Sequence, residues 1–163
     1  MKRYKFNELF KFQKKSKIKA GEGLKEGGKY PFYTSSDKLS KSINTYLFDS
    51  ESLIFGTGGQ ASIHYCENPF AVSTDCLVAQ PKNEKKLLAK YAYYYLFSNI
   101  HILERGFKGA GLKHISKSYI DEILIPVPDK IETQRQIAYV LDKADVVRQQ
   151  RRASIELLDK LLG

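Results

Sequence analysis

The chain contains no long hydrophobic segment and almost no cysteine, and each shortage excludes a class of protein. No apolar run approaches the roughly 18 residues of a membrane-spanning helix, so no membrane contact is predicted. The basic stretch at residues 1–8 is not followed by a continuous apolar segment, which argues against a secretory signal. Cys66 and Cys76 are the only cysteines, so we expect reduced thiols in a cytoplasmic protein rather than a disulfide framework.

The positive charge is unevenly distributed along the 163 residues, which fit one domain with an appendage and show no internal repeat. The net charge is +9, of which residues 1–29 contribute +7 from ten Lys or Arg and three Glu. A solvated basic surface would explain this excess. Polyanion binding would explain it equally, because each neutralised phosphate releases condensed counterions. Charge alone leaves both a nucleic acid and an acidic protein open as partners.

The first 128 residues carry short strand and turn signals, typical of an α+β fold with a compact mixed or antiparallel sheet. A helical turn and a strand are expected within residues 6–19. Further strands are expected at residues 30–34, 52–55, 61–66, 70–73, 76–79 and 123–125. Pro31 favours an edge position for the first of these strands. The second and third form a plausible hairpin across the glycines at residues 56–59.

Two helices are expected within this part of the chain. Residues 84–98 have a helical period, and the tyrosines at 91–95 are more typical of a buried face than of a base-stacking surface. Ser116 can cap a short helix that extends through Ile120. Between the two helices, residues 105–113 form a basic loop rich in glycine.

Residues 129–163 predict one long amphipathic helix. Asp129 is the expected N-cap, with Glu132 completing a capping box. About 31 helical residues would extend roughly 46 Å, too far to bury one apolar stripe on a small domain, so a partner is expected. Arg148 and Arg151 fall in the same stripe and weaken it. The apolar positions have the spacing of a coiled-coil seam: Ile137, Leu141, Ala144, Ile155, Leu158 and Leu162.

Two short motifs resemble parts of a methyltransferase. Residues 55–59, Phe-Gly-Thr-Gly-Gly, look like a cofactor loop, and residues 68–70, Asn-Pro-Phe, look like a catalytic amide–proline signature. The glycines, however, precede a strand pattern, whereas a phosphate-binding loop opens a helix. The motifs also lie too close together for a complete cofactor domain between them. Turn glycines are therefore the preferred interpretation.

No metal or catalytic centre is predicted. His64, Cys66 and Cys76 lack the paired short spacings of zinc ligands, and a Cys–His nucleophile is no better supported. Acidic residues are scattered rather than clustered as in a two-metal nuclease. We accordingly expect no catalytic residues, no metal and no cofactor.

The loop residues form a more coherent pattern. Two loops combine flexible backbone with positive charge and hydrogen-bond donors, the chemistry that contacts phosphates and base edges. An ordinary solvated loop would look similar, so both interpretations stay open for any single residue. The candidate DNA-binding residues are Ser35, Ser36, Lys38, Gln60, Arg105, Lys108, Lys113, His114 and Lys117.

Several segments, taken in order, resemble the specificity subunit of type I restriction-modification systems. The segments that carry the resemblance are residues 30–35, 54–59, 118–120, 123–128 and 132–137. They span nearly the whole chain and look like one target-recognition domain, residues 1–128, with its following helix, residues 129–163. Thr133 departs from the pattern, because an acidic residue is common before Gln134.

The resemblance implies a non-catalytic role. Such a domain reads one half of a split site in double-stranded DNA, and its helix packs antiparallel and docks modification subunits that methylate adenine. The usual subunit has two such halves, so we expect a half-subunit that forms a homodimer through an intermolecular antiparallel coiled coil, with an excised fragment of a longer subunit as the alternative. Twofold symmetry then predicts an interrupted inverted repeat as the target. Two alternatives remain: a catalytic nuclease or methyltransferase, and an interaction-only or decoy subunit that competes for the modification subunit.

Overall fold

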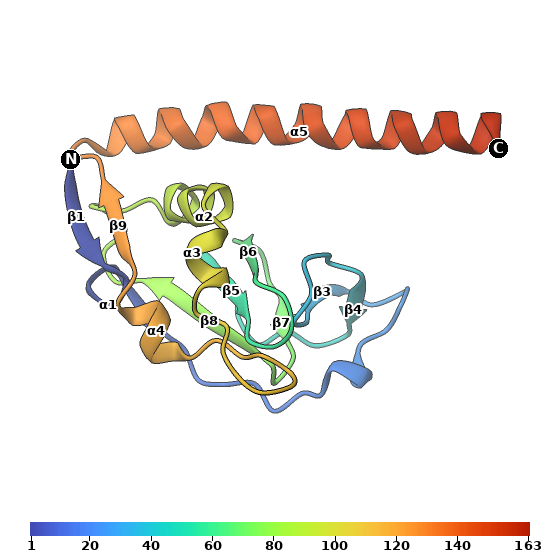
Figure 1. Ribbon diagram of the computed structural model, residues 1–163, viewed down its shortest axis with the longest axis horizontal. Helices are drawn as coiled ribbons and strands as arrows, with labels where there is room; N and C mark the ends of the chain where they lie inside the picture. The colour runs from blue at the N-terminus through green and yellow to red at the C-terminus, as the bar shows by residue number, and fades with distance from the viewer.

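A computed structural model describes all residues from 1 to 163 and contains a compact head with one long helix along its side (Figure 1). The strands are β1 (Lys2–Lys5), β2 (Phe10–Phe12), β3 (Tyr30–Tyr33), β4 (Lys41–Ile43), β5 (Ser52–Gly56), β6 (Ser62–Cys66), β7 (Ala71–Val72), β8 (Cys76–Pro81) and β9 (Leu124–Val127). The helices are α1 (Phe6–Leu9), a 3₁₀ turn η1 (Ala20–Glu22), α2 (Ala89–Ser98), α3 (His101–Glu104), α4 (Lys117–Asp121) and α5 (Ile131–Leu162). The predicted α+β class is confirmed.

The central sheet has the strand order β2-β8-β5-β6 and is antiparallel throughout. Its middle strand β5 is buried at every position, because sheet neighbours lie on both sides and side chains cover both faces. The predicted hairpin is confirmed, with Ser52 opposite Cys66 and Gly56 opposite Ser62. A separate ribbon pairs β1 with β9, which joins the start of the chain to the segment that leads into α5.

The third sheet, β4-β3-β7, corrects one prediction. β3 lies in the middle of this sheet, so the edge position predicted from Pro31 is wrong. Pro31 is opposite Ser42 on the β4 side, whereas β7 pairs only with Phe32 and Tyr33. The proline therefore lies beyond the end of the β7 ladder, where its missing N–H group interrupts no pairing.

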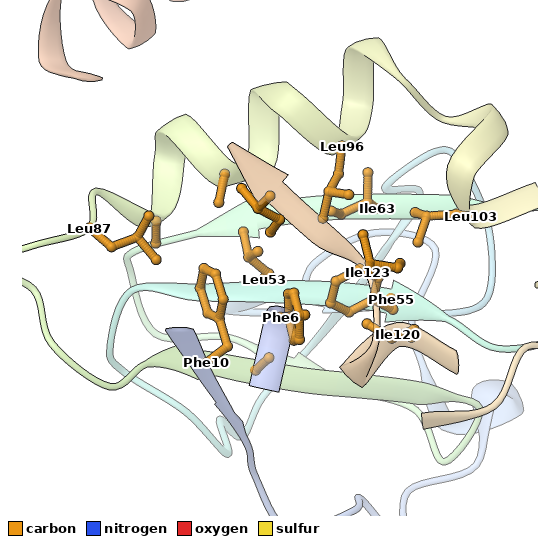
Figure 2. Close-up of a cluster of buried hydrophobic side chains, with 14 of the residues drawn as sticks. Phe6, Phe10, Leu53, Phe55, Ile63, Leu87, Leu96, Leu103, Ile120 and Ile123 are labelled. Carbon is orange, nitrogen blue, oxygen red and sulfur yellow. The ribbon is translucent and has the colours of Figure 1, made fainter. Parts of the chain in front are cut away.

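The main core lies between the central sheet, α2 and the β1–β9 ribbon (Figure 2). Phe6 stacks on Phe10 with ring centroids 4.6 Å apart and meets Phe55 edge-on at 5.5 Å. Each fully buried phenylalanine stabilises the folded chain by roughly 1.5–3 kcal/mol relative to an exposed side chain. Tyr91 is buried in this core and Tyr94 is buried at the contact with α5, so the tyrosine run is mainly packed, as predicted.

The predicted helix over residues 84–98 begins later, at Ala89. The reason is a tertiary contact. The Leu88 N–H donates to Gln134 Oε1 at 2.9 Å, and Gln134 Nε2 donates to the Lys86 carbonyl at 3.0 Å. Gln134 belongs to α5 and is completely buried. The side chain of a distant helix thus satisfies backbone groups that a longer α2 would have used.

α5 confirms the predicted long helix but not its predicted cap. The N-cap is Lys130 rather than Asp129, and no side chain completes the cap. Gln134 Nε2 also donates to the Pro128 carbonyl at 3.1 Å, which fixes the end of β9 and delays the helix to Ile131. The helix contains 32 residues, about 48 Å at 1.5 Å per residue. Every residue from 149 onward is exposed.

The short capped helix is confirmed, since Ser116 Oγ accepts the Tyr119 N–H at 3.2 Å. Among all the helices, none has the combination of length and apolar character that a bilayer crossing requires.

Candidate nucleic-acid interface

Three loops from distant parts of the sequence meet at the end of β5. The Ser35 hydroxyl donates to the Gly58 carbonyl at 2.7 Å and accepts the Gly58 N–H at 2.9 Å. This pair joins the loop after β3 to the glycine turn after β5. Gly56 is buried here, and a Cβ on it would collide with Ser35 and Ser62. The glycines therefore allow close approach of two backbones, a structural use that needs no bound nucleotide.

The third loop, residues 105–116, is attached to the same glycine turn. The Gly59 N–H donates to the Lys113 carbonyl, and the Ile115 N–H donates to the Thr57 carbonyl, both at 3.0 Å. Lys108 and His114 exchange backbone hydrogen bonds at 2.9 and 3.0 Å, which closes the loop on itself. The loop tip is exposed and its glycines adopt positive φ, 142° at Gly109 and 94° at Gly111.

A histidine on β6 contacts the loop that follows β3. His64 Nε2 lies 2.7 Å from the Ser36 carbonyl, and its ring is 5.0 Å from the Tyr33 ring. The sequence raises His64 only as a possible metal ligand or nucleophile partner, whereas its contacts in the structure are those of a positioning residue. Nowhere in the chain do three His, Cys, Asp or Glu side chains gather as a metal site would require.

The structure distributes the nine candidate residues over these loops and their borders. Ser35 and Ser36 are half-buried, while the other seven are exposed. The Ser35 hydroxyl is engaged by Gly58, so its role is to hold the loops together. Lys117 lies on α4 with its ammonium 5.3 Å from the Phe12 ring centroid, at the margin of the cluster. Arg105 follows α3 at the base of the third loop.

A run of lysines that the candidate residues did not include lies beside the same loops. Lys14, Lys15, Lys17 and Lys19 are all exposed on the segment that follows β2. Thr74 anchors this segment by donating its N–H to the Ile18 carbonyl at 2.8 Å. The excess of charge in residues 1–29 was the sequence signal for these lysines, but only the fold places them next to the loops.

The cysteine candidates are part of the packing. Burial raises the pKa of Cys76 to about 12, so its thiol stays protonated near neutral pH. Phe70 of the Asn-Pro-Phe motif is completely buried, and its ring meets Tyr33 edge-on at 5.9 Å. The glycine turn leads into β6 and not into a helix. The predicted turn position of these glycines is therefore confirmed.

A second region of interest is the contact between α5 and the head. Lys90 donates to Asp142 at 3.0 Å, and Tyr94 also donates to Asp142. Burial opposes the ionisation of Asp142, but the bonds from Tyr94 and Lys90 and the Lys90 charge outweigh it and lower the pKa. The pKa of Tyr94 is raised, mainly by burial and secondly by the hydrogen bond and charge of the same carboxylate. Both shifts favour the neutral phenol beside the ionised acid.

The predicted apolar seam of α5 is divided by this contact. Ile137 and Leu141 are partly covered, and Ile137 packs against the main core. Ala144, Ile155, Leu158 and Leu162 are exposed. At 3.6 residues per turn the seam lies roughly 100° around the helix from the side that faces α2. Most of the stripe is therefore open, although its first position, Ile137, already packs against the chain's own head.

A family model described as "Type I restriction modification DNA specificity domain" matches residues 1–157. The EcoDI type I restriction enzyme specificity subunit of Escherichia coli is 27% identical over 135 residues, which are 83% of this chain and 29% of that protein. The MjaVIII specificity subunit of Methanocaldococcus jannaschii is 27% identical over 156 residues, which are 90% of this chain and 36% of that protein.

A solved structure shares the fold. The crystal structure of the type I restriction-modification S subunit from M. genitalium superposes with a TM-score of 0.77 at 21% identity, covering 88% of this chain and 38% of that one. The chain thus spans about a third of the length of the relatives that it matches.

Proposed function

Because the chain belongs to the family of type I restriction modification DNA specificity domains, we propose that it is a non-catalytic module that reads one half-site of double-stranded DNA. In this proposal residues 1–128 recognise the duplex, and residues 129–163 provide the helix that pairs with a second copy and recruits a modification subunit. The recruited subunit performs the methylation, and the chain supplies only the choice of sequence.

The observation that carries the proposal is the joining of three loops at the end of β5. The hydrogen bonds between the Ser35 hydroxyl and the Gly58 backbone, and between the backbones of Gly59 and Lys113, hold the loops in one arrangement, so their exposed side chains are presented together. Such preorganisation favours sequence reading, because binding then costs little loop ordering. Figure 1 places the third loop on the side of the head away from α5, which leaves it free to meet a duplex.

We assign the candidate residues two kinds of contact. Residues with a single mobile charge suit phosphate oxygens, which position the duplex without reading it. Those residues are Lys38, Arg105, Lys108 and Lys117. Residues with amide, hydroxyl, imidazole or ammonium groups at the loop tips suit base edges in the major groove. Those residues are Ser36, Gln60, Lys113 and His114.

The exposed part of α5 supports the pairing and recruitment that we propose. One apolar stripe includes Ile155, Leu158 and Leu162, with side chains between 55 and 85% exposed. A second stripe, Tyr139, Val146 and Leu157, lies roughly 145° further round the helix, and its residues are also exposed. One stripe can bury against an antiparallel second copy while the other accepts a modification subunit, since buried apolar area drives both associations.

The test is duplex binding by paired variants. Lys108→Glu with Lys113→Glu should abolish binding to the duplex that the wild-type chain selects from a random pool, because both positive side chains become carboxylates that the negatively charged duplex repels. Lys85→Glu with Lys86→Glu makes the same charge change beside the start of α5 and should reduce binding far less. A wild-type chain that binds a modification subunit but selects no duplex would instead establish the interaction-only role.

A further inference from the structure

The segment that follows β2 carries a regular row of outward-facing lysines. From Lys15 to Lys19 the residues alternate between exposed and covered positions: Lys15, Lys17 and Lys19 are exposed, Ser16 is buried and Ile18 is half-buried. This is the alternation of an extended chain with one side against the protein. Neighbouring lysines of the row are then about 6.6 Å apart along the chain.

The row is fixed to the head, unlike a free basic tail. The Gln13 N–H donates to the Val78 carbonyl at 2.8 Å, and the Thr74 N–H donates to the Ile18 carbonyl at 2.8 Å. Inside the segment the buried Ser16 hydroxyl accepts the Ile18 N–H at 3.0 Å. The backbone beneath the three ammonium groups is therefore ordered before any ligand arrives.

The contact at Thr74 connects the row to the loops. The next residue, Asp75, accepts both the N–H and the hydroxyl of Thr57 on its backbone carbonyl, each at 2.9 Å. Thr57 begins the glycine turn that Ser35 and the third loop hold. In Figure 1 the segment after β2 and the loop between α3 and α4 lie on the same side of the head, opposite α5.

No acidic side chain neutralises the row. Residues 9–21 contain five lysines and no Asp or Glu. The chain has three ion pairs, formed by Lys5, Lys90 and Arg148, and none includes a lysine of this segment. The nearest acid in sequence, Glu22, accepts the backbone N–H of Lys19 at 2.6 Å. The three ammonium groups thus remain available to an external anion.

We propose that Lys15, Lys17 and Lys19 form a phosphate-binding row that holds the backbone of the duplex next to the bases read by the loops. This inference rests on the proposed function and adds a site of a different kind. The row recognises the regular charge of a duplex backbone and not its sequence, because contacts of flexible ammonium groups with phosphate oxygens position a duplex without carrying sequence information.

The experiment compares the wild-type chain with Lys15→Gln, Lys17→Gln, Lys19→Gln. The dissociation constant is measured against salt concentration for two probes: the duplex selected by the wild-type chain and a mixed-sequence duplex. Removing three phosphate contacts should reduce the slope of log K against log salt by about 2.7. Both duplexes should weaken by the same factor, so that their affinity ratio is unchanged. Side chains this exposed should leave the circular dichroism melting curve as it is.

The matched control is Lys85→Gln, Lys86→Gln, Lys130→Gln, which removes the same charge from a cleft beside the start of α5. Its slope should stay near that of the wild-type chain. An unchanged salt slope in the row variant, or an equal reduction of the slope in the control, would overturn the proposed phosphate-binding row. Weakening of the selected duplex alone would also overturn it, because the lysines would then read bases. If the wild-type chain selects its duplex and Lys108→Glu with Lys113→Glu abolishes that binding, failure of the row leaves the proposed function intact.

Discussion

The Ser35 hydroxyl and the Gly58 peptide group exchange two hydrogen bonds, 2.7 Å from hydroxyl to carbonyl and 2.9 Å from N–H to hydroxyl. The two residues are 23 positions apart, and each lies in a loop without regular secondary structure. The pair therefore does for these loops what a strand pairing does within a sheet. It explains how loops that carry the candidate DNA contacts keep one arrangement.

Ser35→Ala should loosen this junction. Both Gly58 backbone groups lose their partner in a partly buried site, which should cost about 1–2 kcal/mol of stability. Amide hydrogen exchange should accelerate locally at residues 57–59. The loss in free energy of duplex binding should be larger than the loss in free energy of unfolding. Ser40→Ala, at an exposed position, is the control and should change stability by less than about 0.5 kcal/mol. Unchanged exchange at the glycine turn would show that Ser35 does not hold it.

Gln134→Leu should be strongly destabilising. The fully buried amide makes three hydrogen bonds, to Leu88, Lys86 and Pro128, and an apolar replacement leaves those three backbone groups without partners. The expected loss is about 3 kcal/mol or more in urea unfolding. Gln136→Leu, two residues later but exposed, should change stability by about 0.5 kcal/mol at most. Equal effects from the two variants would contradict the conclusion that the hydrogen bonds of Gln134 hold α5 against the head.

Leu158→Asp should separate the proposed dimer into monomers, because a charged group replaces an apolar one in the stripe that the second copy buries. Sedimentation velocity measures the change. Leu158 is 55% exposed in the single chain, so the head should keep its melting temperature when measured as a monomer. Ala153→Asp, roughly on the opposite side of the helix, is the control and should remain dimeric. A wild-type chain that sediments as a monomer at every concentration would refute the pairing.

Stability should decline at alkaline pH because the half-buried phenol of Tyr93 resists ionisation in the folded chain. The pKa of Tyr93 is raised to about 12, mainly by burial and secondly by the charge of Asp145. A pKa raised above the ordinary 10.0 contributes stability that is complete below pH 10 and is lost as pH rises toward 12. Urea unfolding at pH 8 and pH 11 should show this loss, and Tyr93→Phe should reduce it. Tyr46→Phe, at an exposed ring, should not.

Local patterns were sufficient for most of the elements. The β5–β6 hairpin followed from two strand patterns separated by glycines, and the capped turn at Ser116 followed from one hydroxyl at the correct spacing. The long helix followed from its apolar period. These features depend on residues close together in sequence, so a single sequence contains the necessary information. The same is true of the family resemblance, which depended on motifs in order along the chain.

The failed predictions have one shared cause, which is a partner distant in sequence. Gln134 decides where α2 begins and where α5 begins, because it satisfies backbone groups near both helix starts. The length of the β7 ladder decides that Pro31 can lie in a middle strand. Neither effect can be found in a local window.

By itself, the sequence determined the class of fold, the presence of a long exposed helix and the excess of positive charge in residues 1–29, because composition and periodicity express these directly. Only the tertiary structure decided which charged segments lie next to one another. Ser35, Gly58, Lys113 and Ile18 come from four separate segments, and the bonds that Ser35, Thr57, Gly59 and Thr74 make across them gather the loops and the lysine row on one side of the head. The physical reason is that backbone hydrogen bonds must be satisfied wherever the chain packs, and the partners that satisfy them are chosen by proximity in space.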